Sequence, residues 1–248
     1  MGNMVGEHPR LSAVGTRGYL YDHQDNRKVI GFGDAEFRVA TIPRAMAADI
    51  IVRHHYSGRI VQNSYIHLGV YLRGKLLGAL QFGYAMNPAS GKSVVAGTGN
   101  REYLELNRMW LSDDVPRNGE SMAISYATKY IKAAYPDVQW IQSFADERCG
   151  CWGVVYQACN FVYCGFHLTT FYHLDGEWYH DLLVTAHKKG GGRGAFLRAN
   201  LHRAEKHRFR QFRYVLFLRQ AARKRLLKKV LPYPKPGLED AGGRTAAL

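Results

Sequence analysis

Residues 104–121, LELNRMWLSDDVPRNGES, contain the pattern that decides the fold. The first part alternates as a strand over residues 102–111, and a Pro- and Gly-containing turn over residues 112–121 leads into a periodic helix over residues 122–135. A turn of this kind directs free backbone N–H groups and the positive end of a helix dipole at one place. The order strand, turn, helix therefore predicts a seat for an anion such as a phosphate.

Strand and helix patterns continue on both sides of this stretch and predict a mixed α/β (α+β) fold. Asn160 and the pair Asp175-Gly176 provide turn residues that can adopt left-handed backbone conformations. The expected elements are a strand at 37–41, a helix at 44–56, a hairpin of 65–71 and 76–83, a strand at 141–146, a short helix at 154–161, and a hairpin of 161–171 and 178–186.

The positive charge of the chain is concentrated near its C-terminus. The formal net charge is +14, and residues 188–229 contain fifteen Lys and Arg against one acid, Glu205, so the remainder is neutral. Basic blocks of this kind are typical of segments that bind a polyanion. An apolar stripe predicts a long basic helix, or two helices, over residues 195–230, which docks on the body or on a second copy. The candidate residues for binding a polyanion such as DNA are Arg198, Arg203, Arg208, Arg210, Arg213, Arg219, Arg223, Lys224 and Arg225.

The composition argues against membrane and secretory classes. No stretch approaches about 18 consecutive apolar residues, and the N-terminus lacks an apolar signal core, so we expect a cytoplasmic protein with no membrane span. Four cysteines, Cys149, Cys151, Cys159 and Cys164, fall close together, but without the spacing of a zinc knuckle. We interpret them as packed thiols.

Five motifs occur in one order along roughly residues 42–165. They are RHHY at 53–56, LELNR at 104–108 with WL at 110–111, PRNGES at 116–121, SFAD at 143–146 and YQACNF at 156–161. In this order they resemble the GNAT acyltransferase superfamily and, within it, the Mom group of phage DNA-modification proteins. One residue departs from the superfamily pattern, because Pro116 stands where a basic or amide residue is usual; Arg117 can supply the charge.

The resemblance implies a GNAT-like mixed central sheet flanked by helices and an acetyl-CoA cofactor. The residues that would hold the coenzyme are Asn107, Met109, Leu111, Arg117, Asn118, Gly119, Glu120 and Ser121. Glu120 opposes an anion, so we expect its side chain to turn away. The alternative is that this stretch is an ordinary surface turn that caps a helix.

The candidate catalytic residues are His55, Tyr56, Arg108, Asp146 and Tyr156. His55 changes charge near neutral pH, and Tyr56 can orient or donate a proton, although a His-Tyr pair also caps helices. Arg108 binds a DNA phosphate, a coenzyme carbonyl or Asp146. The resemblance assigns Tyr156 to protonation of the thiolate leaving group. Iron is associated with the Mom group, and His55, Tyr56 and Asp146 are the candidate ligands.

The resemblance implies that the chain adds a methylcarbamoyl (acetamido) group to N6 of adenine in double-stranded DNA, which hides phage DNA from host restriction. This reaction requires base flipping, because N6 is paired in a duplex. The alternatives are an N-acyltransferase acting on a protein or small amine, and a non-catalytic nucleic-acid-binding protein on the same scaffold. The expected domains are a loosely ordered N-terminal extension at 1–33, a catalytic domain at 34–187, a basic segment at 188–231 and a disordered tail at 232–248. The apolar stripe of the basic segment also permits a homodimer.

Overall fold

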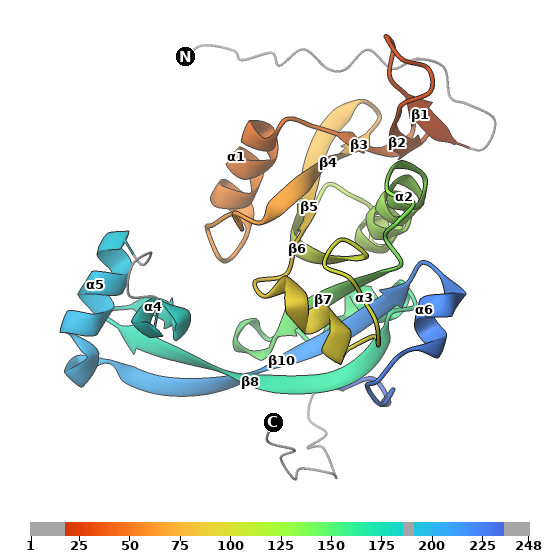
Figure 1. The fold of residues 1–248 in the computed structure, drawn as a ribbon. Coiled ribbons are helices and arrows are strands. Elements are labelled where there is room, and N and C mark those ends of the chain that lie inside the picture. Colours follow the sequence, from red (N-terminus) through yellow and green to blue (C-terminus); the bar gives the residue numbers. More distant parts are fainter. Residues whose placement is uncertain (1–17, 186–190, 236–248) are drawn as a thin grey trace, which may run out of the picture. The chain divides into compact units, whose positions relative to one another are not determined.

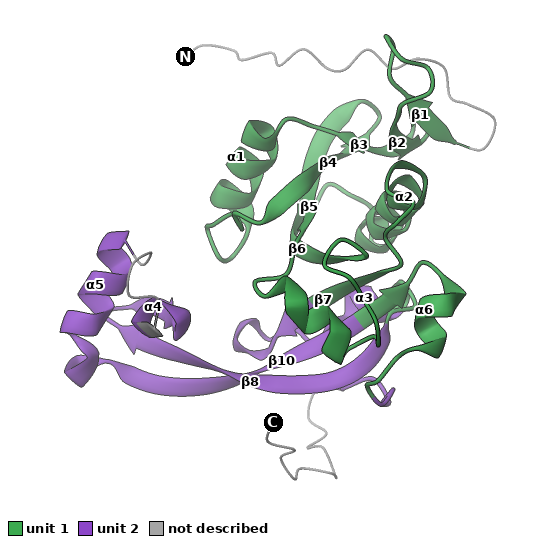
Figure 2. Cartoon of the chain, viewed as in Figure 1, with its two compact units in different colours: residues 1–143, 158–161, 215–228 green, residues 144–157, 162–214, 229–248 purple. Residues whose placement is uncertain are grey.

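The computed structural model describes residues 18–185 and 191–235, which form two compact units (Figures 1 and 2). Unit 1 comprises residues 1–143, 158–161 and 215–228, and unit 2 comprises residues 144–157, 162–214 and 229–248. The chain therefore passes from one unit to the other several times. The fold is mixed α/β, as the sequence predicts, with a large sheet flanked by helices.

The sheet of unit 1 follows the chain order of its strands. Neighbouring strands are antiparallel up to β6, and β6 and β7 are parallel, paired over Tyr103–Glu105. The strands are β1 (Tyr19–Tyr21), β2 (Val29–Gly33), β3 (Phe37–Thr41), β4 (Ser64–Leu72), β5 (Lys75–Gly83), β6 (Tyr103–Leu111) and β7 (Trp140–Asp146).

Two helices of unit 1 cover opposite faces of this sheet (Figure 1). Helix α1 (Arg44–His54) begins after Pro43 and buries Ala47 against a cluster that includes Ala40 and Ala79. Helix α2 (Gly119–Ala134) lies on the other face, where Tyr126 contacts Phe32 and Phe37 edge to face. The sheet is thus buried between α1 and α2, and the turn before α2 follows directly from β6.

Unit 2 is built on three strands, in the spatial order β10, β8, β9. Leu174 of β8, Tyr179 of β9 and Leu197 of α5 form its buried apolar cluster. Its elements are the strands β8 (Val162–Leu174), β9 (Glu177–His180) and β10 (Glu205–Phe217), the helices α3 (Val154–Ala158), α4 (Leu182–Thr185) and α5 (Gly191–Ala199), and the 3₁₀ helices η2 (Glu147–Cys149) and η3 (Leu201–Arg203). The short elements η1 (Pro88–Ser93) and α6 (Gln220–Lys224) belong to unit 1.

The predicted long basic helix is wrong. Residues 205–217 form strand β10, between the short helices α5 and α6. The spacing of Phe209, Phe212 and Leu216 suits a helix, but the buried pair Phe212 and Tyr214 follows the period of two that a strand requires. The central part of the basic block, residues 205–217, is therefore a strand of the sheet, and α5 and α6 are the short helices on either side of it.

The N-terminal expectation also needs correction. Residues 18–33, expected as a loose extension, contain β1 and β2, and Leu20 is buried in the cluster under α1. Residues 1–17 and 236–248, which include most of the expected disordered tail, lie outside the described residues.

The turn residues behave as the sequence predicts. Asn160, after α3, has φ of 61°, and Asp175 and Gly176 have φ of 50° and 79° in the β8–β9 hairpin. Positive φ at both central residues is the requirement of a type I′ turn, which Asp-Gly meets at little cost. Strand β9 ends at His180, so the expected strand 178–186 is shorter, and α4 replaces its second half.

Candidate functional site

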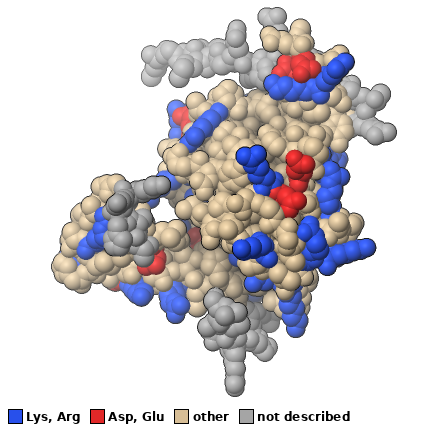
Figure 3. Space-filling view, in the orientation of Figure 1, with Lys and Arg blue, Asp and Glu red and all other residues tan. Residues whose placement is uncertain are grey.

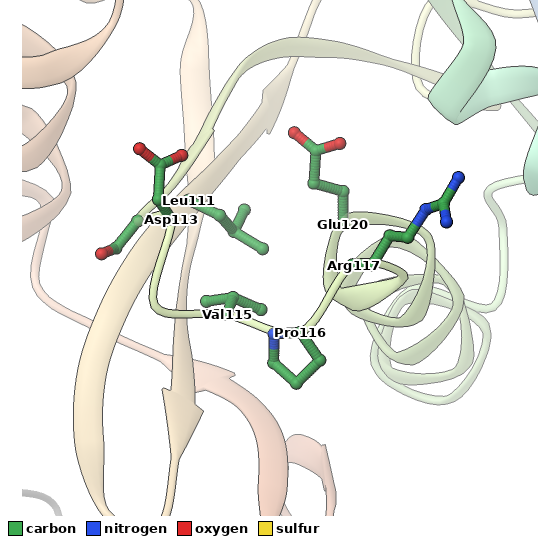
Figure 4. A pocket seen from close by; sticks show the side chains of 7 residues that line it. Leu111, Asp113, Val115, Pro116, Arg117 and Glu120 are labelled. Carbon is green, nitrogen blue, oxygen red and sulfur yellow. The ribbon is translucent and has the colours of Figure 1, made fainter.

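The turn between β6 and α2 lines an open pocket of about 320 Å³ (Figure 4). Gly119, the first residue of α2, lies against the side chain of Val115, since a Cβ at this glycine would lie 2.0 Å from Val115 Cγ1. The turn is thus closed by a contact that only glycine permits. The pocket is lined by Leu111, Ser112, Asp113, Val115, Pro116, Arg117 and Glu120.

The first turn of α2 faces this region with backbone donors. The N–H groups of Glu120 and Ser121 belong to the first turn, where an α-helix supplies no acceptor of its own. The N–H of Gly119 donates to Pro116 O over 2.7 Å, and the Ser121 hydroxyl donates to Asn118 O over 2.9 Å. Asn118 precedes the helix without a side-chain capping bond. The helix dipole and these N–H groups favour an anion here.

The charged side chains around the pocket have mixed signs. Asp113 and Glu120 contribute carboxylates that point to the same side in Figure 4, while the guanidinium of Arg117 points to another. Glu120 lines the pocket, contrary to the expectation that it turns away from an anion. An anion in this pocket therefore depends on backbone donors and Arg117, with both carboxylates opposing it.

The predicted coenzyme residues on β6 have different environments. The Asn107 side chain is buried, and its Oδ1 accepts a 2.9 Å hydrogen bond from the Ser64 hydroxyl. Met109 is half-buried, and Leu111 lines the pocket. The ladder between β6 and β7 covers Tyr103–Glu105 and stops before Asn107. The side chain of Asn107 thus stabilises the fold through its bond to Ser64, while Leu111 is the residue of β6 that lines the pocket.

Three of the predicted catalytic residues lie together at the C-terminal end of α1. The rings of His55 and Tyr56 are 4.2 Å apart between centroids. Arg108 donates through Nε to Arg59 O over 3.1 Å, and the Ser57 hydroxyl oxygen lies 3.3 Å from the same carbonyl oxygen. The Ser57 hydroxyl is also 2.8 Å from His55 Nδ1, so a chain of contacts joins His55 to Arg108.

The hydrogen bonds of His55 define its tautomer. The backbone N–H of Ser57 donates to Nδ1 over 3.1 Å, so Nδ1 is the acceptor and Nε2 carries the proton. Burial lowers the pKa of His55 to about 4, and the positive charge of Arg108 acts in the same direction. The imidazole is therefore neutral at neutral pH and can donate through Nε2, contrary to the expectation that it changes charge there.

Ser57 and Arg59 are the residues of this cluster that the sequence analysis did not identify. Arg59 acts through its backbone carbonyl, and Ser57 acts through both its backbone N–H and its hydroxyl. Backbone contacts do not depend on residue type, so the sequence motif did not include Arg59.

The remaining predicted catalytic residues, Asp146 and Tyr156, belong to unit 2. Asp146 is buried, and its carboxylate accepts from the backbone N–H of Arg148 over 3.0 Å and from the guanidinium of Arg148 over 3.3 Å. Tyr156, on α3, lies with its ring 5.4 Å from that of Tyr214. Unit 2 thus gives Asp146 a charged partner in Arg148, and the convergence of all five residues stays a prediction.

The nine candidate DNA-binding residues divide into two groups. Arg208, Arg219, Arg223 and Lys224 are exposed, although Arg219 also donates to Pro136 O over 3.3 Å. The others contact groups of their own unit, and these contacts are Arg198 with Leu183 O, Arg203 with Asp175, Arg210 with Glu147, Arg213 with the Phe144 ring, and Arg225 with Ala96 O and Gln139. On the face in Figure 3, Lys and Arg side chains are spread out among acidic ones.

The described residues do not form a metal site. Within residues 18–185 and 191–235, no group of three or more His, Cys, Asp or Glu side chains is arranged to hold a metal ion. The candidate ligand His55 has Nδ1 engaged by Ser57, and Asp146 is paired with Arg148.

Comparison with known proteins matches the chain to a family over most of its length. The family model of the Mom protein family matches residues 36–235. This chain belongs to the Mom family. It is 55% identical over 236 residues to the protein named methylcarbamoylase mom from Escherichia phage Mu, covering 94% of this chain and 97% of that relative. The match extends on both sides of the five motifs and includes the basic segment.

Solved acetyltransferase structures resemble the chain more distantly. The RimL acetyltransferase of ribosomal L7/L12 is 9% identical with a TM-score of 0.43, covering 75% of this chain and 96% of its own. Arabidopsis thaliana NAA60 in complex with acetyl-CoA is 10% identical with a TM-score of 0.45, covering 73% and 99%. A GNAT-family acetyltransferase from Streptococcus pneumoniae is 14% identical with a TM-score of 0.43, covering 73% and 99%.

Proposed function

We propose that this chain adds a methylcarbamoyl group to N6 of adenine in double-stranded DNA and so protects phage DNA from host restriction. The observation that carries the proposal is the 55% identity to the phage Mu methylcarbamoylase over nearly the whole of both chains. We expect the reaction to take place in the host cytoplasm. Among the residues that the structure describes, no helix is long and apolar enough to cross a membrane.

We propose acetyl-CoA as the cofactor, with its diphosphate at the start of α2. The support is the pocket beside Gly119 and the backbone N–H groups of Glu120 and Ser121, which suit an anion. Arg117 adds one positive charge, and the backbone of β6 between Asn107 and Leu111 is where the pantetheine would lie. When bound, acetyl-CoA supplies the two-carbon unit of the transferred group.

The cluster of unit 1 suggests distinct roles for its side chains. His55, neutral with its proton on Nε2, donates a hydrogen bond to an oxygen of the reacting group and does not serve as a cationic acid. Arg108, held by Arg59 O, stabilises negative charge that develops nearby. Tyr56 orients the acceptor beside His55. We propose that Asp146 accepts the proton that leaves adenine N6 and that Tyr156 protonates the coenzyme A thiolate as an amine-type nitrogen donor replaces it. Bonding of N6 to the methyl carbon also requires a two-electron oxidant, which takes up the hydrogen lost from that carbon.

Adenine N6 is paired in a duplex, so the target base must leave the helix at a cost of a few kcal/mol. Phosphate contacts offset this cost, and the exposed cations Arg208, Arg219, Arg223 and Lys224 are the best placed of the nine candidates to make them.

Nucleoside analysis tests the proposed function directly. DNA from cells that express the chain is digested and examined by mass spectrometry, with an Arg108→Gln variant as the matched control. We expect methylcarbamoyl-deoxyadenosine with the wild-type chain and much less with the variant. Feeding the purified protein acetyl-CoA labelled in its acetyl carbons should place the label in the modified base. Finding only unmodified deoxyadenosine with the folded wild-type chain would overturn the proposal.

A further inference from the structure

The two faces of the β9–β8–β10 sheet in unit 2 differ in character. On one face, Leu174 and Tyr179 pack with Leu197 of α5 in the apolar cluster of this unit. Residues alternate between faces along a strand, so Trp178, next to Tyr179, points to the opposite face. That second face carries aromatic rings and imidazoles rather than aliphatic side chains.

Trp178 lies in the middle of this second face. Its ring centroid is 4.8 Å from that of His173, 5.1 Å from that of His207 and 5.5 Å from that of Phe209. The Arg148 guanidinium carbon is 5.8 Å from the Trp178 centroid. We call these five residues the Trp178 face.

Part of the Trp178 face is open to solvent. The side chains of His173 and His207 are 37% and 40% exposed, and Trp178 and Phe209 are half-buried. Glu205 is the acidic side chain at its rim, 3.4 Å from His207 and 3.9 Å from His173. A face built only for packing would gain more from aliphatic side chains than from exposed imidazoles, because each imidazole keeps polar nitrogens that require water or a partner.

Aromatic rings beside cations, on a basic strand, are the combination that binds unpaired bases. Every base offers a π-face for stacking, and neighbouring Lys and Arg attract the phosphates. Arg148 supplies the cation on this face, and the exposed Lys206 and Arg208, on either side of His207, have side chains that leave from the opposite face of β10. The same combination is poorly suited to a lipid surface, since imidazole and guanidinium groups interrupt the apolar area.

We propose that the Trp178 face stacks on an unpaired base of DNA, with His207 as the exposed ring that the base covers and Trp178 as its support. The proposal rests on the proposed function for the identity of the partner as DNA. It adds a base-binding surface on β8–β10 to the reaction, through which an extruded or single-stranded base is held.

The test compares DNA with and without bases. Fluorescence anisotropy measures binding of the full-length protein to a short oligodeoxyadenylate and to an abasic oligomer of the same length, which keeps the phosphates. We expect the wild type to prefer the oligodeoxyadenylate and His207→Ala to reduce that preference about fivefold or more, because stacking contributes about 1–3 kcal/mol per base. Trp178→Leu should reduce it further.

Phe166→Ala is the matched control, because Phe166 is 44% exposed and contacts Arg210 and Phe212 rather than Trp178. It should leave the preference unchanged, and thermal unfolding checks that each variant folds. An unchanged preference in folded His207→Ala and Trp178→Leu, or no preference in the wild type, would overturn the proposal. The nucleoside assay is independent of this measurement, so a base preference without modified adenine would count against the proposed function alone.

Discussion

The backbone N–H of Ser57 donates a hydrogen bond of 3.1 Å to Nδ1 of His55. This contact leaves the proton of the neutral ring on Nε2, and burial together with Arg108 holds the pKa of His55 at about 4. The ring nitrogen that faces away from Ser57 is thus a hydrogen-bond donor throughout the neutral range. The His-Tyr pair in the sequence on its own suggests an acid or base instead.

We predict that His55 does not titrate between pH 5 and 8. Nitrogen-15 NMR of labelled imidazoles should show the Nε2–H tautomer at pH 7 and a midpoint for this ring near 4. The Ser57→Pro variant, which lacks the donor N–H, should lose the tautomer preference. A midpoint close to 6.5 for His55 in the wild type would contradict the prediction.

The same shift gives His55 a defined effect on stability. Its pKa is lower in the folded chain than the ordinary value of 6.5, so the unfolded chain binds a proton that the folded chain excludes. The contribution is complete above about pH 6.5 and is lost as the pH falls towards 4. We expect His55→Gln to lose less stability than the wild type between pH 7 and pH 4.5, measured by urea unfolding at both pH values.

Arg208 and Arg210 are close in sequence and should differ in their effect on DNA affinity. Arg208 is exposed on β10, whereas the guanidinium of Arg210 donates to Glu147 Oε1 over 2.8 and 2.6 Å. Each phosphate contact contributes about 0.9 to the slope of log affinity against log salt. We predict that Arg208→Ala lowers this slope by about 1 in a titration of duplex DNA over several salt concentrations. A wild-type slope in Arg208→Ala would show that Arg208 makes no phosphate contact.

Glu147 should matter for stability rather than for binding. Its Oε2 accepts the backbone N–H of Arg210 over 2.7 Å, in addition to the guanidinium bonds to Oε1. Burial alone would raise the pKa of Glu147, but the hydrogen bonds and charge of Arg210 outweigh it and lower the pKa. We predict that Glu147→Gln costs about 1.5–3 kcal/mol in the free energy of unfolding at pH 7. The difference should shrink below about pH 4.5, where the unfolded carboxyl is protonated.

The sequence predicted the core of unit 1 well because its signals are local. The hairpin of β4 and β5 and the helix after Pro43 follow from turn residues and from hydrophobic spacing. The left-handed backbone conformation of Asn160 could be predicted because it, too, depends on the residue type at a single position. The spacing of residues did not predict that the β6–α2 turn belongs to a site. That prediction came from the family resemblance, which depends on the order of the motifs around the turn.

Strand β10 was missed because its residues carry two patterns at once. Phe209, Phe212 and Leu216 recur at helical spacing, while the alternation of Phe212 and Tyr214 is short and surrounded by arginines. What decides between the two patterns is pairing with β8, a contact between segments far apart in the sequence. Glu147 is also far from Arg210 in the sequence, so the sequence did not predict the ion pair between them.

The cysteines offer a check on burial. Burial raises the pKa of Cys159 to about 12, with the charge of Glu120 acting in the same direction, whereas Cys151 is exposed. The thiolate is the reactive form, so Cys159 should resist alkylation at pH 8. We predict that mass spectrometry after brief iodoacetamide treatment finds Cys151 modified well before Cys159. Rapid labelling of Cys159 in the folded protein would show that its contact with Ser121 O at the start of α2 opens readily.

Substitutions at Gly119 and Val115 test whether the turn before α2 binds the coenzyme. A Cβ at residue 119 would lie 2.0 Å from Val115 Cγ1, so Gly119→Ala must displace the turn that lines the pocket. We predict a loss of about 1–3 kcal/mol in the free energy of unfolding and weaker acetyl-CoA binding by calorimetry.

Shortening Val115 should relieve the clash, since its Cβ would be 3.3 Å from the added methyl group. The double variant Val115→Ala/Gly119→Ala should therefore recover much of both losses, with Val115→Ala alone as the control. Recovery of stability without recovery of acetyl-CoA binding would show that the shape of the turn is insufficient to hold the coenzyme. Unchanged acetyl-CoA binding in Gly119→Ala would place the coenzyme elsewhere, because a displaced turn cannot keep the first N–H groups of α2 aligned on a diphosphate.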